Sequence, residues 1–146
     1  MVADNESSSL PPLSLYVHLP WCVKKCPYCD FNSHALPDKA PLSEYTTALK
    51  RELDFWCPQI GERPIFSIFI GGGTPSLFPS GQIEDFMSYV RQQFNVDENL
   101  EVTLEANPGT VDEKNFAGYF AAGVNRLSIG AQSFNDQHLK SLGRIH

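Results

Sequence analysis

The spacing of apolar residues along this chain switches repeatedly between the two-residue period of strands and the helical period of three to four residues. Residues 13–19 alternate as far as Tyr16 and predict a strand that ends at Pro20. Helical spacing follows over 41–56, at Leu42, Tyr45, Leu49, Leu53 and Trp56. Pro41 suits the first turn of this helix, and Cys57 is expected to be a half-buried thiol at its end.

A second strand and helix are predicted beyond residue 63. Residues 64–70 form a nearly continuous apolar run, which suits a strand buried on both faces within a parallel sheet. The three glycines of 71–73 begin a turn, and Ser80 is placed to cap the next helix. One face of that helix is apolar, through Ile83, Phe86, Met87, Val90 and Phe94.

A third unit follows the same scheme. Residues 100–106 alternate strictly between apolar and polar positions, which predicts a strand, and an Asn-Pro-Gly sequence then breaks it. Thr110 and Glu113 have the spacing of a capping box for a helix that runs to Ala122. Gly123 is expected to close this helix.

The fourth unit consists of a strand predicted over 124–130 and a helix over 135–142, with Gly143 as its stop. Four successive strand–helix units imply an α/β fold of parallel strands joined by helical crossovers. An open doubly wound sheet and a barrel both fit this order. Because four units cannot close a barrel by themselves, residues 13–146 are expected to be the first part of a longer protein.

Composition and charge narrow the possible functions. The chain has 146 residues, of which 42% are hydrophobic, and this is enough for a sizeable core. Its formal net charge of -6 argues against a nucleic-acid surface, because phosphate binding needs basic patches. No apolar run approaches the length of a membrane span. Residues 1–12 lack the features of a signal peptide and are expected to be a disordered lead-in, which favours a cytoplasmic, reducing location.

Three of the four cysteines, Cys22, Cys26 and Cys29, lie within one eight-residue stretch. Their spacing lets one tight loop aim three thiolates at a single point. Such thiolates hold iron–sulfur clusters, and a cluster with three protein ligands keeps one iron open to a small molecule. An incomplete zinc knuckle and a disulfide with a spare thiol are the alternatives.

Other unusual groups follow the later strands, and parallel α/β folds bind ligands at the carboxyl ends of their strands. The triple glycine either lets bare backbone approach a ligand or forms a plain flexible turn. Glu105 either accepts hydrogen bonds from a ligand or lies on a solvated strand face. Arg144 either clamps a carboxylate or lies on the surface. Together with Gln132, these groups are expected to face the same pocket as the cysteines.

Three sequence segments together resemble a known family. They are Tyr16-Val17-His18-Leu19-Pro20-Trp21-Cys22 continued by Cys26-Pro27-Tyr28-Cys29-Asp30-Phe31, then Gly71-Gly72-Gly73-Thr74-Pro75-Ser76, and Glu105-Ala106-Asn107-Pro108. This combination resembles the radical S-adenosylmethionine (radical SAM) superfamily. Within it, the chain is most similar to the branch of oxygen-independent coproporphyrinogen III oxidases, and there to the heme-chaperone members. The matching motifs run from Tyr16 to Arg144.

The resemblance implies the first four units of a partial (β/α)6 barrel, with residues 13–146 as the N-terminal part of the radical SAM core. It implies a [4Fe-4S] cluster on Cys22, Cys26 and Cys29, whose open iron binds S-adenosylmethionine. The residues implied to contact that cofactor are Tyr16, the backbone of Tyr28, Gly72, Gly73, Thr74, Glu105, Gln132 and Arg144. Heme would be the cargo, and a heme-acceptor protein and an electron donor would be the partners.

One departure distinguishes the branches. Oxidase members have a further cysteine two residues after the third, whereas this chain has Phe31 there. The resemblance therefore favours a heme chaperone and puts coproporphyrinogen decarboxylation in doubt. A radical enzyme acting on a porphyrinogen or another small substrate is the second hypothesis, and a non-catalytic zinc module is the third. No role is assigned to the four histidines.

Overall fold

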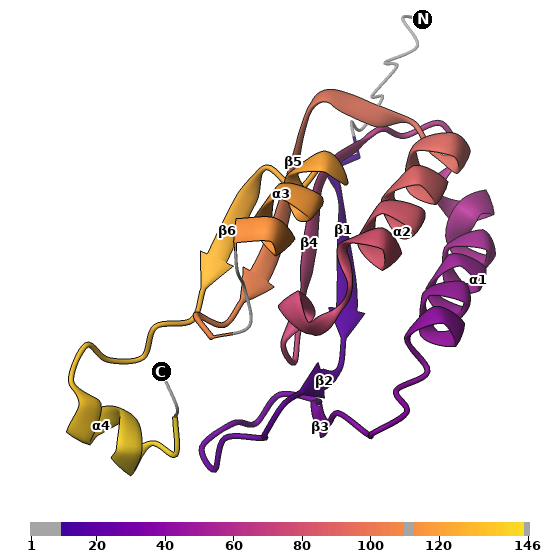
Figure 1. Cartoon of the computed structure of the whole chain (residues 1–146). Coiled ribbons are helices and arrows are strands. Elements are labelled where there is room, and N and C mark those ends of the chain that lie inside the picture. Colours follow the sequence, from indigo (N-terminus) through magenta and orange to yellow (C-terminus); the bar gives the residue numbers. More distant parts are fainter. Residues whose placement is uncertain (1–9, 110–112, 145–146) are drawn as a thin grey trace, which may run out of the picture.

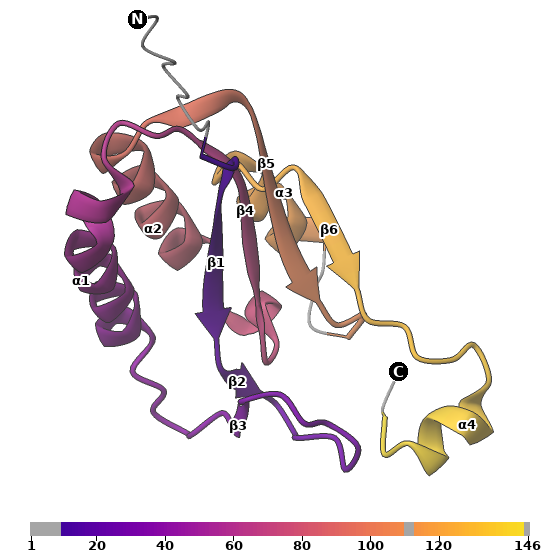
Figure 2. The ribbon, with the colours of Figure 1, turned by 180° about the vertical axis from the view of Figure 1, so that it is seen from behind.

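The computed structural model describes residues 10–109 and 113–144, and its centre is a parallel sheet. The sheet contains β1 (Leu13–Leu19), β4 (Ile65–Gly72), β5 (Val96–Ala106) and β6 (Arg126–Ile129), in that order. Three helices, α1 (Leu42–Ile60), α2 (Ser80–Gln93) and α3 (Glu113–Ala121), lie against one face of it (Figures 1 and 2). The predicted α/β class with parallel strands is confirmed.

Smaller elements gather beyond the carboxyl ends of the strands (Figure 1). A two-residue pair, β2 (Trp21–Cys22) and β3 (His34–Ala35), closes the base of the cysteine loop. A 3-10 turn, η1 (Pro75–Leu77), follows β4, and α4 (Asp136–Ser141) lies away from the sheet. The pair and the turn have no counterpart among the predicted elements, because segments of two or three residues are too short to show a period.

Helix ends follow the predicted signals in part. The side chain of Asn135 caps α4 by accepting hydrogen bonds from the backbone N–H groups of Gln137 (2.9 Å) and His138 (3.3 Å). Gly123 and Gly143 have positive φ angles of 99° and 69°, the left-handed conformation expected of glycine after a helix. The predicted capping box begins at Thr110, which lies outside the described residues.

Two expectations about helix ends are wrong. Ser80 does not cap α2, since Pro79 holds the cap position and no side chain bonds there. Helix α1 continues through Pro58 to Ile60, so Cys57 lies inside the helix and is exposed rather than half-buried. A proline removes one backbone N–H and disfavours a helix, but packing of the opposite face against the sheet can outweigh that local cost.

The expectation that the second strand is buried on both faces is also wrong. In β4, Ile65, Ile68 and Ile70 are buried, whereas Phe66 is exposed and Phe69 is half-buried. The reason is that the described helices cover only one face of the sheet (Figure 2).

The hydrophobic core fills the space between the sheet and its helices. Its fully buried members include Ile68, Ile70, Val90, Leu104 and Met87, contributed by β4, β5 and α2. Tyr119 of α3 is also 1% exposed, and its hydroxyl lies 2.8 Å from the carbonyl oxygen of Phe78 and 3.0 Å from that of Ser76. This buried phenol therefore connects α3 to η1 and to Phe78, the residue that follows it.

Replacing Tyr119 with phenylalanine is expected to lower the free energy of unfolding by about 1–3 kcal/mol, because it removes a buried donor and leaves the ring in place. Chemical denaturation followed by circular dichroism measures the difference. Phe120→Tyr on the neighbouring, exposed position is the control and is expected to change stability by less than about 0.5 kcal/mol. Equal stability of Tyr119→Phe and the unmodified protein would contradict the role given to the hydroxyl.

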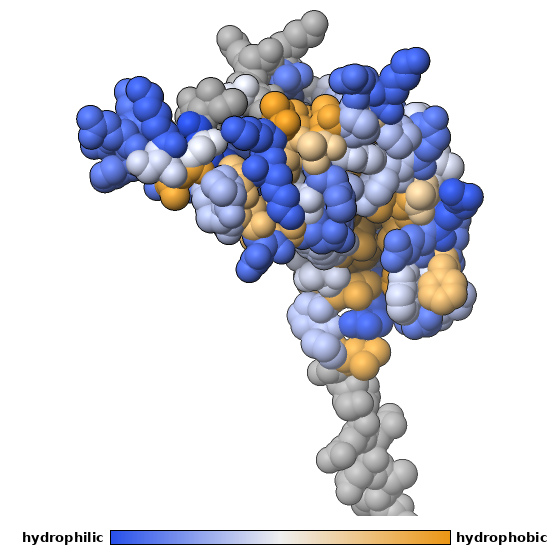
Figure 3. All heavy atoms as spheres, turned by 90° about the horizontal axis from the view of Figure 1, so that it is seen from below, coloured by the Kyte–Doolittle hydropathy of each residue, from blue (hydrophilic) through white to orange (hydrophobic). Residues whose placement is uncertain are grey.

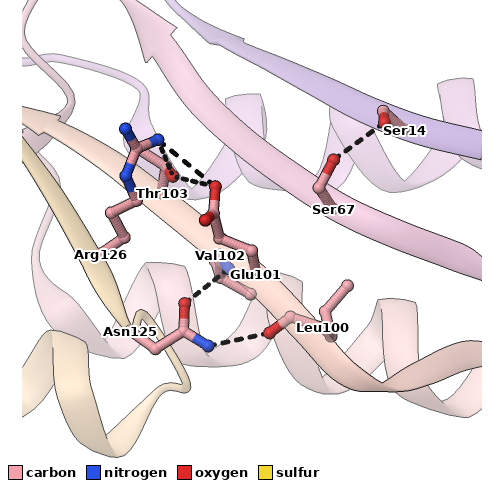
Figure 4. Close-up of polar contacts among 8 residues, drawn as sticks. All are labelled: Ser14, Ser67, Leu100, Glu101, Val102, Thr103, Asn125 and Arg126. Atoms are coloured by element: carbon pink, nitrogen blue, oxygen red, sulfur yellow. Dashed lines mark hydrogen bonds and ion pairs between the residues drawn. The ribbon is translucent and has the colours of Figure 1, made fainter.

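The other face of the sheet carries polar side chains (Figure 4). Ser67 Oγ lies 2.8 Å from Ser14 Oγ, and Arg126 Nη1 lies 3.3 Å from both Glu101 Oε1 and Thr103 Oγ1. Asn125 bridges to the main chain of β5, accepting from Val102 N and donating to the carbonyl of Leu100, each at 2.8 Å. The serine pair supports the pairing of β1 with β4, and the contacts of Asn125 and Arg126 support the register of β5 against β6.

Viewed from the end where the strands finish, the surface is mainly hydrophilic, with separate apolar groups between the polar side chains (Figure 3). Such scattered apolar groups are usual on a protein surface. Within the described part of the chain, no helix is both long and apolar enough to cross a membrane.

Candidate functional site

A pocket lies at the carboxyl ends of the strands, where the cysteine loop faces the ends of β4, β5 and β6. Its lining brings together segments that are far apart in the sequence. The lining residues include Cys22, Lys24, Cys26, Tyr28, Cys29, Phe31, Gly72, Gly73, Thr74, Glu105, Asn107, Ser128, Gly130, Gln132 and Arg144. The predicted convergence of the cysteine loop with the ends of three later strands is therefore present in the structure.

The cysteine loop is closed at its base by main-chain hydrogen bonds. His34 N donates to Pro20 O and Leu36 N donates to Cys22 O, both at 2.8 Å. Inside the loop, Cys29 N donates to Cys26 O at 3.1 Å and forms a tight turn between those two cysteines. All three loop cysteines are free thiols and half-buried. Among the described side chains, no group of three or more His, Cys, Asp or Glu is arranged for a single metal ion.

The glycine segment packs directly against the start of the cysteine loop. Gly73 N donates to Leu19 O at 2.8 Å, and Thr74 N donates to Trp21 O at 2.7 Å. A Cβ added at Gly73 would lie 2.7 Å from the backbone of both Pro20 and Trp21. The first two glycines belong to β4, so the interpretation as a plain flexible turn is wrong. Glycine is needed here because two main chains approach each other closely.

Glu105 and Arg144 are held in place by hydrogen bonds from different elements. The carboxylate of Glu105 accepts from the backbone N–H of Gly72 at 3.2 Å, which joins β5 to the glycine segment. The Arg144 guanidinium donates through Nη2 to Asn107 Oδ1 (2.7 Å) and Gly130 O (2.9 Å). Its Nη1 lies 3.7 Å from Cys26 Sγ. The alternative interpretations from the sequence, a solvated Glu105 and a surface-exposed Arg144, are therefore wrong.

One buried donor of this guanidinium has no partner among the residues that the structure describes. Arg144 Nε is inaccessible to solvent and makes no hydrogen bond within the described residues. Buried polar atoms are nearly always paired, so this N–H is suited to an acceptor atom of a ligand in the pocket.

Tyr28 and Thr74 complete the side of the pocket near the cysteines. Burial raises the pKa of the Tyr28 phenol, and a hydrogen bond and charge from Cys26 raise it further. Thr74 is buried and its Oγ1 accepts from Asn107 Nδ2 at 3.4 Å. Gln132 lines the pocket after β6. Together with these three, seven other residues singled out from the sequence line the same pocket: Cys22, Cys26, Cys29, Gly72, Gly73, Glu105 and Arg144.

Tyr16 is the exception, because it does not line this pocket. Its ring is 58% exposed on the polar face of the sheet and stacks on Phe69 with ring centroids 6.3 Å apart. Its hydroxyl lies 3.0 Å from Nδ1 of His18. Burial raises the pKa of this phenol, and the charge of Glu105 adds to the effect.

Asn107 is the main site residue to which the sequence assigned no role. Its amide bonds Arg144 on one side and Thr74 on the other, and so connects two parts of the pocket wall. Its position directly after a strand was a usable signal, but an asparagine beside Pro108 and Gly109 is also typical of a turn.

Comparison with known proteins gives consistent results. The family described as the radical SAM superfamily matches residues 16–146. Heme chaperone HemW of Haemophilus influenzae is 52% identical over 94% of this chain and 37% of its own length. HemW of Escherichia coli is also 52% identical, over 94% of this chain and 36% of its own length. The protein named radical S-adenosyl methionine domain-containing protein 1, mitochondrial, of Bos taurus is 41% identical over 91% of this chain and 30% of its own length.

Among solved structures, the chain is similar to coproporphyrinogen III oxidase (HemN) from Escherichia coli, which is described as a radical SAM enzyme. The two superimpose with a TM-score of 0.85 and 32% sequence identity, over 92% of this chain and 31% of the other. This likeness shows that the sheet and its helices match part of a radical SAM barrel. The chain spans about a third of the length of the relatives it matches. Because the family match covers nearly all of its residues, the chain belongs to the radical SAM superfamily.

Proposed function

We propose that this chain forms part of the cofactor-binding core of a heme chaperone, a protein that binds heme and delivers it to an acceptor protein. The observation that carries the proposal is the identity of 52% to two bacterial proteins named heme chaperone HemW, over 94% of the chain. A related mitochondrial protein from Bos taurus is less similar, at 41% identity. The relatives extend well beyond this segment, so heme and its acceptor belong to the proposal for the whole protein.

The pocket fits a [4Fe-4S] cluster by the chemistry of its donors. Thiolates are the usual ligands of such clusters, and Cys22, Cys26 and Cys29 all line this one pocket. The nearby Arg144 guanidinium supplies a positive charge 3.7 Å from Cys26 Sγ, which complements the negative charge of a cluster bound by thiolates. We assign the three cysteines as the cluster ligands.

The same pocket offers suitable groups for S-adenosylmethionine. Among the described residues, the N–H of Arg144 Nε has no protein partner, so it can donate to a ligand carboxylate. Glu105 offers a carboxylate to hydroxyl or amine donors, and Gly72, Gly73, Thr74, Gln132 and the Tyr28 backbone form the surrounding wall. Tyr16 is assigned an indirect role, since its hydroxyl contacts His18, whose ring lies against Gly72. A cluster held by Cys22, Cys26 and Cys29 would supply the electron for cleavage of the sulfonium of S-adenosylmethionine. The protein residues orient that cofactor and exclude water.

A second candidate function is an oxygen-independent coproporphyrinogen III oxidase, and the structural likeness to HemN favours it. Phe31 argues against it. This residue lines the pocket and is 68% exposed, at the position where oxidase members have a further cysteine. A phenyl ring provides neither a thiol nor a thiolate, so any step that depends on that cysteine is lost. We therefore prefer the chaperone function. We further propose that the protein acts in the reducing cytoplasm and receives electrons from a donor of unknown identity.

The two functions are separated by one experiment on the full-length protein. The protein is purified without oxygen, reduced, and incubated with S-adenosylmethionine and coproporphyrinogen III, and the decarboxylated product is measured by chromatography. In parallel, heme binding and transfer to apo-hemoproteins are followed by absorption spectroscopy. We expect heme transfer without decarboxylation. Formation of the decarboxylated product would overturn the chaperone assignment, and a colourless protein with stoichiometric zinc would overturn the cluster.

A further inference from the structure

His18 lies at the junction of three segments that build the pocket. It is the second-last residue of β1, and its side chain is half-buried. Its ring packs on Gly72, since a Cβ added at that glycine would lie 2.7 Å from Nδ1 and Cε1 of His18. Its Nε2 lies 2.8 Å from the carbonyl oxygen of Asn32, near the far end of the cysteine loop. The backbone carbonyl of His18 in turn accepts from the Tyr45 hydroxyl of α1 at 2.8 Å.

These partners determine the tautomer of the neutral ring. A carbonyl oxygen can only accept, so Nε2 must carry the proton that is donated to Asn32. Nδ1 is then an acceptor, and the hydroxyl of Tyr16 donates to it at 3.0 Å. Tyr16 therefore orients the imidazole, and the imidazole binds the loop.

Few side chains connect the cysteine loop to the rest of the protein. Within the described chain, the side-chain hydrogen bonds between residues 22–33 and other segments come from His18 and Arg144. Lys25, Cys29 and Ser33 make their side-chain contacts inside the loop. His18 acts at the Asn32 end, whereas Arg144 acts at Cys26 in the middle.

From this geometry we propose that His18 is a positioning residue that holds the cysteine loop over the glycine segment, so that the three thiols face the pocket before any cluster is present. It does not bind the metal or the cofactor. Tyr16 contributes to this positioning, since its hydroxyl orients the imidazole of His18. This role rests on the proposed cluster site. It also predicts that the cysteine loop is held in place in the cluster-free protein.

The test uses three replacements at His18 in the full-length protein. Glutamine can place an amide N–H near the position of Nε2 and keep the bond to Asn32, whereas asparagine is too short and leucine has no donor. Hydrogen–deuterium exchange is measured over residues 22–36 in the cluster-free protein, and iron loss to a chelator is timed after reconstitution. We expect His18→Leu and His18→Asn to accelerate both by about fivefold to tenfold, the effect of one lost hydrogen bond. His18→Gln should restore both rates to near those of the unmodified protein.

His34→Leu is the matched control, because His34 lies in the same segment with an exposed side chain. It is expected to leave both rates unchanged, and peptides from α2 and β5 should exchange normally in every variant. Unchanged loop exchange in His18→Leu would overturn the proposal. Faster exchange throughout the protein, without rescue by His18→Gln, would also overturn it and make His18 a general packing residue. Hydrogen–deuterium exchange is measured without cluster or heme. The exchange result therefore stands whether or not the heme-transfer experiment fails.

Discussion

Replacement of Cys26 by alanine is expected to abolish assembly of the cluster. The three loop thiols, which we propose as the cluster ligands, all line the pocket, and two cysteines are too few to hold a [4Fe-4S] cluster against loss to solution. After anaerobic reconstitution, the unmodified protein should contain about four iron atoms per chain and the variant close to none. Iron and sulfide analysis, together with the visible absorption of the cluster, measures this.

Cys57→Ala is the matched control, since it removes the same chemical group from an exposed position in α1. Cys57 does not line the pocket, so its replacement should leave the iron content as in the unmodified protein. Full iron in Cys26→Ala would refute the ligand assignment. Loss of iron in Cys57→Ala would refute it as well, because the fourth cysteine would then be a ligand.

Gly73→Ala is expected to damage both the fold and the site. The new methyl group would lie 2.7 Å from the Pro20 and Trp21 main chains, and main-chain atoms cannot rotate away as a side chain can. Forced overpacking of this kind typically costs about 1–3 kcal/mol, and it would push the cysteine loop away from β4. We expect a fall of that size in the free energy of unfolding, measured by denaturation, and a large loss of iron after reconstitution.

Gly81→Ala tests whether the effect is local. No atom lies within 4 Å of a Cβ added at Gly81 near the start of α2, and alanine favours a helix more than glycine does. Its stability should therefore be equal to or greater than that of the unmodified protein. Gly73→Ala with normal stability and normal iron content would show that the close approach of the two main chains is unimportant.

The overall architecture was predictable because it depends on patterns that repeat over many residues. The alternation over 100–106 and the helical spacing over 41–56 each involve several side chains, so local exceptions do not hide them. Parallel strands necessarily end at one edge, and this is why the cysteine loop, Gly72, Glu105 and Gln132 could be expected around one pocket. Their roles toward a cofactor stay predictions.

Features that depend on contacts between distant segments were not predictable. Pro58 lies inside α1, although a proline locally predicts the end of a helix, so the continuation to Ile60 could not be expected from the sequence. The Gly71-Gly72-Gly73 sequence is typical of a flexible turn, and only its neighbours Pro20 and Trp21 show why side chains are excluded. Asn107 and His18 are ordinary polar residues in the sequence, and their partners lie 37 and 14 positions away.

The contact between Arg144 and Cys26 joins residues 118 positions apart, and this has a consequence for the order of events during synthesis. A nascent chain that has emerged only as far as α2 already carries its three clustered thiols, but lacks Glu105, Asn107 and Arg144. Since chains emerge from the amino terminus and such long-range contacts form late, the three thiols exist for a time without the cation and carboxylate that complete their surroundings. If the proposed ligand assignment holds, a cluster delivered during that interval would meet an open loop, so we expect insertion only after all four strand–helix units are complete.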